Sequence, residues 1–307
     1  MVSVFLRHNS FSMRLISLFS ILFLIISSCT LNKTFLHPIV LEQGDKLSAY
    51  IPEANDTLTL SFNKDLTTNV TNSAGETPDL PYSIETILFP NRSGDTLHGW
   101  FFEPNEDYNG TTIYFLHGNA ANIAYQYLFA TPFVTAGYQV FIFDYSGFGF
   151  SQGEATRKAV KNDATDGLNY LVARKDIKYD HLLIYGQSLG GHLSVVIANE
   201  NQDKIDGLVT EGAFSSHKDI SASVVPFLGR IFTREMYSAE KNIVGFKKPI
   251  LIIHSREDER IPFDQGERLY ELANEPKEFY MIDKKHIRGP LYYADSITAK
   301  MARMVGN

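Results

Sequence analysis

The chain has 307 residues, of which 44% are hydrophobic and 21% are charged, a composition typical of a globular protein. This length accommodates one α/β domain with a sizeable core. The formal net charge is −7 and the basic residues form no stripe along the sequence, which argues against a nucleic-acid partner.

The N-terminus has the pattern of a secretion signal. Basic residues and no acidic residue precede an apolar stretch from Leu15 to Ile26, which suits a signal peptide better than a membrane span. Small residues then precede Cys29, and this arrangement resembles a bacterial lipobox. We expect residues 1–28 to be a signal peptide and Cys29 to be lipidated. The protein would then be a membrane-anchored lipoprotein of the bacterial cell envelope.

Alternatives to this interpretation stay open. The segment also fits a plain signal peptide, or a membrane anchor with an incidental cysteine, and translation could start at Met13. Cys29 is the only cysteine in the chain, so the sequence offers no intramolecular disulfide.

Residues 29–80 follow as the expected lipidated N-terminus, tether and lead-in. They are rich in Thr, Asn, Asp and Ser and show weak periodicity, which predicts loose structure. Leu58–Phe62 alternates between apolar and polar residues and is a candidate strand.

Residues 81–307 predict an α/β domain with a mostly parallel sheet covered by helices on both faces. Tyr82–Phe89 and Thr96–Phe102 predict an initial hairpin. Functional residues of such sheets gather at the carboxyl ends of the strands. Further strands are expected at Thr111–Leu116, Tyr138–Phe143, Leu182–Tyr185, Ile205–Thr210, Pro249–Ile253 and Glu278–Ile282, and helices at Ala121–Ala136, Arg157–Arg174, His192–Asn199, Phe263–Ala273 and Leu291–Val305.

An insertion over residues 213–247 lies between two of these strands. Its stretch Ser221–Phe232 is apolar enough to form a small helical cap over the site, and a plain surface crossover is the alternative.

The most informative motif is Gly186-Gln187-Ser188-Leu189-Gly190, which lies between a predicted strand and a predicted helix. This context favours a sharp turn with Ser188 at its tip as a nucleophile. Glycines on both sides leave room for the turn and for close packing of the strand against the helix.

A serine nucleophile needs a base, and three histidines follow Ser188 in the chain: His217, His254 and His286. His254 ends an apolar strand and is better explained as structural. His286 follows the last predicted strand, in a loop, and is the best candidate for the base.

The base needs a carboxylate to orient it. Asp258 lies in the loop after the strand that ends at Ile253, and we favour it as the acid. Glu211, at the end of the preceding strand, is the alternative. Glu257 and Glu259 are interpreted as solvated charges.

The oxyanion hole needs two backbone N–H donors. One is expected at Leu189, directly after the nucleophile, and the other at Asn119, in the loop after the strand Thr111–Leu116. His117 would shape that loop, and Gly118 would let its backbone approach the substrate.

Four motifs occur in sequence: His117-Gly118-Asn119-Ala120, Asp144-Tyr145-Ser146-Gly147-Phe148-Gly149, Gly186-Gln187-Ser188-Leu189-Gly190-Gly191 and the stretch from His254 to Pro262. Together they resemble the α/β-hydrolase superfamily, in particular its Bem46/ABHD13-like branch of serine hydrolases, over residues 82–305. The resemblance implies an α/β-hydrolase fold and a triad of Ser188, Asp258 and His286. It also implies an oxyanion hole built by Asn119 and Leu189.

The expected function is hydrolysis of small-molecule carboxylic esters through an acyl-enzyme. Neither a cofactor nor a metal is required, and no His/Asp/Glu group has the sequence spacing of metal ligands. A peptidase or a thioesterase is the alternative within the same fold. A non-catalytic lipoprotein that binds a ligand or partner is the alternative from another class.

Overall fold

The computed structural model describes residues 35–51 and 55–306. The predicted signal peptide, residues 1–28, and the predicted lipidation site Cys29 lie outside the described residues. Among the helices that the structure describes, none has the length and apolar character that a membrane crossing requires.

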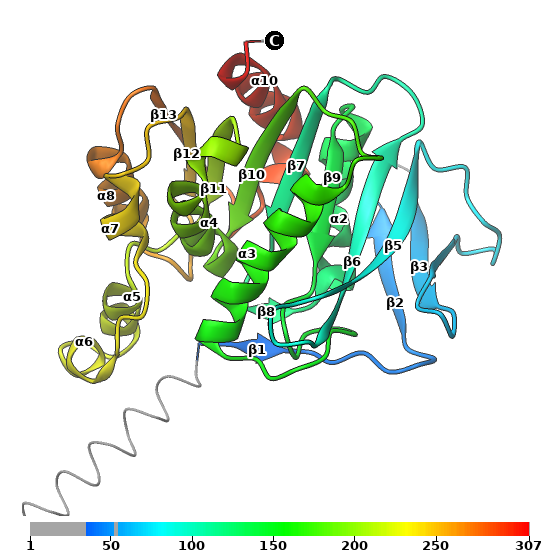
Figure 1. The fold of residues 1–307 in the computed structure, drawn as a ribbon, viewed down its shortest axis with the longest axis horizontal. Helices are drawn as coiled ribbons and strands as arrows, with labels where there is room; N and C mark the ends of the chain where they lie inside the picture. Colours follow the sequence, from blue (N-terminus) through cyan, green and yellow to red (C-terminus); the bar gives the residue numbers. More distant parts are fainter. Residues whose placement is uncertain (1–34, 52–54, 307) are drawn as a thin grey trace, which may run out of the picture.

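A central eight-stranded sheet carries helices on both of its faces (Figure 1). Its strands are β5 (Tyr82–Pro90), β6 (Thr96–Pro104), β7 (Thr111–Leu116), β9 (Gln139–Phe143), β10 (His181–Gln187), β11 (Gly207–Glu211), β12 (Ile250–Ser255) and β13 (Lys277–Ile282). They are ordered β13-β12-β11-β10-β7-β9-β6-β5. All pairings are parallel except β5 with β6 and β6 with β9. The predicted mostly parallel sheet is therefore confirmed.

The central parallel strands are buried on both faces because the connecting helices cover the sheet. Every residue of β7, β9, β11 and β12 is buried. Strand register then fixes the position of the site, since Leu116 pairs with Gly186 and Gln187 pairs with Glu211. The carboxyl ends of β7, β10 and β11 consequently lie side by side at one edge of the sheet.

Two hydrophobic layers hold the helices on the sheet. One layer includes Leu168 and Leu193 of the helices on one face, and the other includes Phe133 and Ile297 on the opposite face. Side-chain caps start two of the helices, because Asn122 and Thr156 accept hydrogen bonds from N–H groups of the first turn. The helices that cover the sheet are α2 (Ile123–Thr135), α3 (Arg157–Ala173), α4 (Leu189–Glu200), α8 (Phe263–Leu272), α9 (Gly289–Tyr292) and α10 (Ala294–Met304), with a short 3₁₀ turn at Gln202–Lys204.

The lead-in is more ordered than its composition predicts. Strands β2 (Lys46–Ile51), β3 (Asp56–Phe62) and β4 (Thr68–Thr71) form a separate antiparallel sheet. The candidate strand Leu58–Phe62 is confirmed within β3, and the expectation of loose structure over the rest of these strands is wrong. Leu60 and Val70 are buried in the same layer as Trp100, and Phe62 stacks on Trp100 with ring centroids 6.5 Å apart. Packing against the main domain orders strands whose own pattern is weak.

A two-residue strand, β1 (His37–Pro38), precedes this sheet and pairs in parallel with β8 (Ala120–Ala121). Three short helices occupy the predicted insertion: α5 (His217–Val224), α6 (Leu228–Phe232) and α7 (Ala239–Ile243). Helix α7 packs against α4 and α8, whereas α5 and α6 pack on each other and project from the body of the domain (Figure 1).

Candidate active site

Ser188 lies at a strained turn between β10 and α4. Its backbone angles are φ 56° and ψ −116°, a conformation that few non-glycine residues adopt. A Cβ atom at Gly186 would collide with the carbonyl oxygen of Gly190, and one at Gly190 would collide with that of Leu116. The two glycines are therefore required by close backbone approach, as the sequence motif predicts. The structure places Ser188 as expected, at the carboxyl edge of the sheet.

Backbone donors flank this serine. Leu189 is the first residue of α4, so its N–H group has no acceptor within the helix and points out of the helix N-terminus. On the other side, a Cβ atom at Gly118 would lie 3.5 Å from the Cβ of Ser188, so the loop from His117 to Asn119 faces the serine. The positions of Leu189 and Asn119 suit the predicted oxyanion hole.

Asn119 is held by a segment that the sequence interpretation treated as a tether. Its carbonyl oxygen accepts a hydrogen bond from the N–H of His37 at 2.7 Å, and its side-chain Nδ2 donates to the carbonyl of Phe35 at 3.1 Å. Composition gave no signal for this contact, because it joins residues 84 positions apart in the sequence.

His286 and Asp258 form a buried pair. Nδ1 of His286 donates to Oδ2 of Asp258 at 2.7 Å, and both side chains are less than a tenth exposed. The other carboxylate oxygen, Oδ1, accepts the N–H groups of Arg260 at 2.9 Å and Ile261 at 2.8 Å. Burial alone would raise the pKa of Asp258, but the hydrogen bonds from His286 and these N–H groups outweigh it and lower the pKa. Asp258 is therefore ionised and its orientation is fixed.

Contacts at Gly212 and Gln187 bring this pair close to the serine turn. A Cβ atom at Gly212 would lie 3.1 Å from Cε1 of His286 and 3.3 Å from Oδ2 of Asp258. The side chain of Gln187, the residue before Ser188, donates to the carbonyl of Ile287 at 3.4 Å. The loop that carries His286 therefore packs directly beside the carboxyl ends of β10 and β11.

Glu211, the alternative acid, has a different set of partners. It is completely buried, and its carboxylate accepts hydrogen bonds from the hydroxyl of Tyr185 (2.6 Å), Nε2 of Gln187 (2.7 Å) and the N–H of Gly289 (2.7 Å). Burial raises its pKa. These bonds connect β10 and β11 to α9. In the described contacts, the carboxylate bonded to the imidazole of His286 is that of Asp258, while Glu259 accepts the backbone N–H of His286 at 3.1 Å.

The two histidines expected to be structural are buried. Nδ1 of His117 donates to the carbonyl of Gly118 at 2.8 Å, and its ring stacks on Tyr145 with centroids 4.2 Å apart. Nε2 of His254 donates to the carbonyl of Ile261 at 3.1 Å and thereby holds the loop that carries Asp258. Burial lowers the pKa of both imidazoles, so they are neutral parts of the scaffold.

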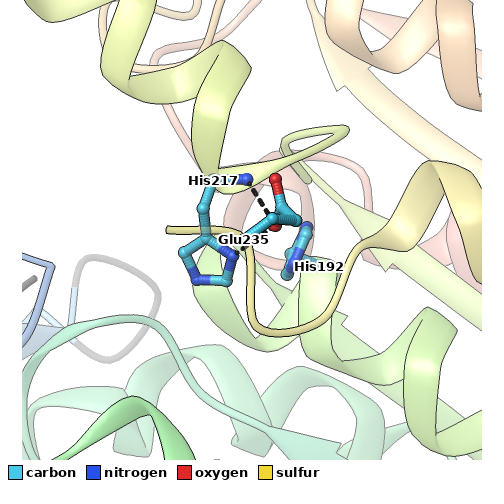
Figure 2. A group of neighbouring side chains, drawn as sticks. All are labelled: His192, His217 and Glu235. Carbon is cyan, nitrogen blue, oxygen red and sulfur yellow. Dashed lines mark hydrogen bonds and ion pairs between the residues drawn. The ribbon is translucent and has the colours of Figure 1, made fainter. Parts of the chain in front are cut away.

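The fold gathers one group of residues that could supply metal ligands among those described. His192, His217 and Glu235 each offer a ligand atom, and these atoms lie within 4.8 Å of one another (Figure 2). Sequence spacing did not reveal the group, because its members come from α4, from α5 and from the loop before α7. The expectation from the sequence concerned spacing along the chain, and the fold brings these three side chains together from distant positions.

Hydrogen bonds already engage both imidazoles of this group. Nδ1 of His192 donates to the carbonyl of Phe214 at 2.8 Å, and Nδ1 of His217 lies 3.1 Å from Oε1 of Glu235. Burial lowers the pKa of His192 to about 3, so its ring is neutral. The observed contacts join the insertion to the helix that follows Ser188.

The sequence is similar to proteins with this fold. Residues 111–242 match the family described as the alpha/beta hydrolase fold. The uncharacterized protein YfhR of Escherichia coli K12 is 33% identical over 216 residues, which are 68% of this chain and 75% of YfhR. Protein bem46 of Schizosaccharomyces pombe is 33% identical over 172 residues, which are 54% of this chain and 58% of bem46.

Solved structures of esterases have the same architecture. The Pyrococcus furiosus esterase Pf2001 superposes with a TM-score of 0.63 at 15% identity, covering 88% of this chain and 97% of that chain. Est1E from Butyrivibrio proteoclasticus, solved with ferulic acid bound, superposes with a TM-score of 0.61 at 15% identity, covering 72% of this chain and all of that chain (100%). Identity this low is informative about the fold alone.

Proposed function

This chain belongs to the α/β-hydrolase superfamily, and from that membership and its site we propose that it is a serine hydrolase that cleaves carboxylic esters. The observation that carries the proposal is the buried pair of His286 and Asp258, 2.7 Å apart, beside the strained turn at Ser188. A carboxylate held on Nδ1 leaves Nε2 of the imidazole as the atom that can take a proton.

The first half of the reaction acylates the serine. Oγ of Ser188 attacks the ester carbonyl while Nε2 of His286 accepts the hydroxyl proton. The carbonyl oxygen becomes negative and is stabilised by the N–H groups of Leu189 and Asn119. His286 then donates its proton to the leaving alcohol, and Asp258 stabilises the imidazolium throughout. The product of this half is an acyl-enzyme on Ser188.

The second half releases the acid. A water molecule takes the place of the alcohol and His286 removes its proton, so that hydroxide attacks the acyl carbonyl. The same donors stabilise the second oxyanion. Ser188 leaves with the proton returned by His286, and the enzyme is regenerated without a metal or cofactor in the chemistry.

The peptidase alternative loses its candidate recognition group. An aminopeptidase needs an acidic side chain that faces the substrate amine, and Glu211 is the acid at the end of β11 that could serve this role. Its carboxylate is completely buried and accepts three hydrogen bonds from Tyr185, Gln187 and Gly289. Thioesters share the acyl chemistry of esters, so both kinds of substrate should be assayed with the purified protein.

Labelling with a fluorophosphonate probe tests the proposed nucleophile in the purified full chain. We expect the wild-type protein to be labelled and Ser188→Ala to be unlabelled. Ser194→Ala is the matched control. Ser194 is a buried serine of α4, the helix that follows Ser188, and its hydroxyl donates to the carbonyl of Gly191. Labelling that persists in Ser188→Ala would move the nucleophile elsewhere. A folded wild-type protein that resists labelling would favour a non-catalytic binding protein.

We also propose that Cys29 anchors the enzyme to a membrane of the bacterial envelope. The proposal depends on the sequence, in which an apolar stretch and small residues precede this cysteine. Mass spectrometry of the N-terminal peptide from the producing cells should find a diacylglycerol-modified cysteine. Cys29→Ala should release the protein from the membrane fraction, and an unmodified Cys29 in the mature protein would contradict lipidation.

A further inference from the structure

The hairpin of α5 and α6, residues 217–234, exposes large apolar side chains. Val224 is 75% exposed, Phe227 78% and Ile231 60%, and Val225 and Leu228 lie between them in the sequence with 40% and 49% exposure. Scattered apolar residues are ordinary on protein surfaces, but a concentration of them on one projecting element indicates an interaction site.

The turn at the tip of this hairpin is strained. Phe227 has φ 65° and ψ −59°, and the N–H of Leu228 donates to the carbonyl of Pro226 at 2.7 Å. These angles define a γ-turn of the rare strained kind. This turn presents an exposed aromatic side chain between the two helices of the hairpin. Backbone strain without compensating burial is typical of functional segments.

The hairpin is also cationic on an acidic protein. Residues 217–234 contain three basic residues, Lys218, Arg230 and Arg234, and one acid, Asp219, which pairs with Arg230, whereas the whole chain has a net charge of −7. The carboxylate of the next residue, Glu235, accepts the backbone N–H groups of His217 and Lys218. Exposed apolar side chains and basic residues in the same hairpin suit a surface of anionic lipids.

The described chain begins next to this hairpin. The ring of Phe35 packs edge-on against His217, the first residue of α5, with centroids 5.3 Å apart. Its carbonyl accepts the hydrogen bond from Asn119 that was described above. Helices α5 and α6 and strand β1 lie at the same end of the molecule (Figure 1). Phe35, the first described residue, therefore lies between the hairpin and the oxyanion loop.

The number of residues between a membrane anchor and Phe35 limits how far the anchor can lie from the hairpin. Five residues separate Cys29 from Phe35, which allows an extended reach of about 20 Å. If the apolar stretch ending at Ile26 were retained as the anchor, the reach would be about 30 Å. Both alternatives keep the carboxyl edge of the sheet close to the bilayer.

We propose that the α5–α6 hairpin inserts its apolar tip into an anionic lipid bilayer and thereby turns the active site toward the membrane that holds the anchor. Phe227 and Ile231 enter the acyl boundary, while Arg230 and Lys218 contact lipid head groups. The ester substrate is then a membrane lipid that reaches Ser188 from the bilayer. This inference rests on the proposed esterase function and on the proposed anchor.

The depth of the tip in the bilayer tests the docking without requiring catalysis. The full lipidated chain with Phe227→Cys carries an environment-sensitive fluorophore and is reconstituted into vesicles of phosphatidylcholine and phosphatidylglycerol. We expect a blue shift and quenching by brominated lipids. The matched control is Leu88→Cys, because Leu88 is 50% exposed on the edge strand β5 and should remain in water. Equal emission at both positions would overturn the proposal, as would a blue shift that depends on protein concentration and not on lipid.

Kinetics test the route of the substrate. Phe227→Asp and Ile231→Asp should slow hydrolysis of a long-chain ester embedded in vesicles by about tenfold or more, because inserting a carboxylate into the apolar boundary costs at least 1.4 kcal/mol, which is about one factor of ten. Both variants should keep the wild-type rate on a soluble short-chain ester. Leu88→Asp should change neither rate. Equal losses of rate on the embedded and the soluble ester would overturn the proposed route of the substrate from the bilayer. A protein that inserts into the bilayer but hydrolyses neither ester would contradict the proposed function instead.

Discussion

Replacing Asp258 by Asn tests the geometry of the candidate site most directly, because the substitution preserves the shape of the side chain. Oδ1 of Asp258 accepts two backbone N–H groups, from Arg260 and Ile261. An amide at this position must keep its oxygen there and turn its NH₂ group toward Nδ1 of His286. Nδ1 must then accept a hydrogen bond, so the proton of the neutral imidazole moves to Nε2. In that tautomer the ring cannot take the proton of Ser188.

The expected loss is large. A carboxylate and an imidazolium about 4 Å apart between charge centres stabilise each other by about 4 kcal/mol at the effective dielectric constant of a protein site. The substitution removes that stabilisation and also imposes the wrong tautomer. We therefore expect kcat to fall by about 10³- to 10⁴-fold, which corresponds to about 4 to 5.5 kcal/mol, with KM nearly unchanged.

Steady-state hydrolysis of p-nitrophenyl butyrate, run beside fluorophosphonate labelling, provides the assay. Glu211→Gln is the control, because Glu211 is a buried carboxylate at the same edge of the sheet whose partners are Tyr185, Gln187 and Gly289. The NH₂ group of the new amide would face a hydrogen-bond donor where the carboxylate oxygen now accepts a hydrogen bond. We therefore expect a loss of stability of about 1–3 kcal/mol and a much smaller loss of kcat. A larger loss of kcat in Glu211→Gln than in Asp258→Asn would refute the assignment and transfer the acid role to Glu211.

Three other outcomes are expected. The pKa of Asp258 is lowered in the folded state, so its charge stabilises the fold at pH values above the pKa of the unfolded state, about 3.9. This stabilisation is lost as the pH falls through the pKa of the folded state. The difference in Tm between wild type and Asp258→Asn should therefore narrow below pH of about 4, and a constant difference would contradict the pKa shift. Gly190→Ala forces a Cβ against the carbonyl of Leu116 and should destabilise the fold by about 1–3 kcal/mol in urea unfolding, whereas an unchanged midpoint would show that the turn relaxes. Treatment with EDTA should leave esterase activity unchanged, and a loss that Zn²⁺ restores in wild type but not in His192→Ala would assign a metal to the group in Figure 2.

The fold class was predictable because its signals are local. Apolar runs such as Ile250–Ile253 predict strands buried on both faces, and the helical pattern between them predicts a parallel sheet. The turn at Ser188 was predictable for the same reason. Its glycines lie two residues before and two residues after Ser188, and a Cβ at Gly186 would collide with the following helix. The collision of a Cβ at Gly190 with the carbonyl of Leu116 depends instead on the neighbouring strand.

Local signals failed where distant parts of the chain complete each other's packing. Within the sheet of β2, β3 and β4, the sequence indicated only the candidate strand Leu58–Phe62, and Leu60 and Val70 become buried only against the main domain. The contact between Phe35 and Asn119 is likewise invisible in composition, since it depends on where the segment around β1 packs against the loop at Asn119.

The sequence by itself determined the α/β architecture, the turn that presents Ser188, and the small set of residues from which a base and an acid could be chosen. It left Asp258 and Glu211 as alternatives, because both follow strands whose carboxyl ends meet at one edge. The tertiary structure decided which of them is bonded to His286, and it gathered His192, His217 and Glu235 from three separate elements. The physical reason is that a hydrogen bond tolerates only a few tenths of an ångström of variation in the distance between donor and acceptor. Packing between elements sets that distance.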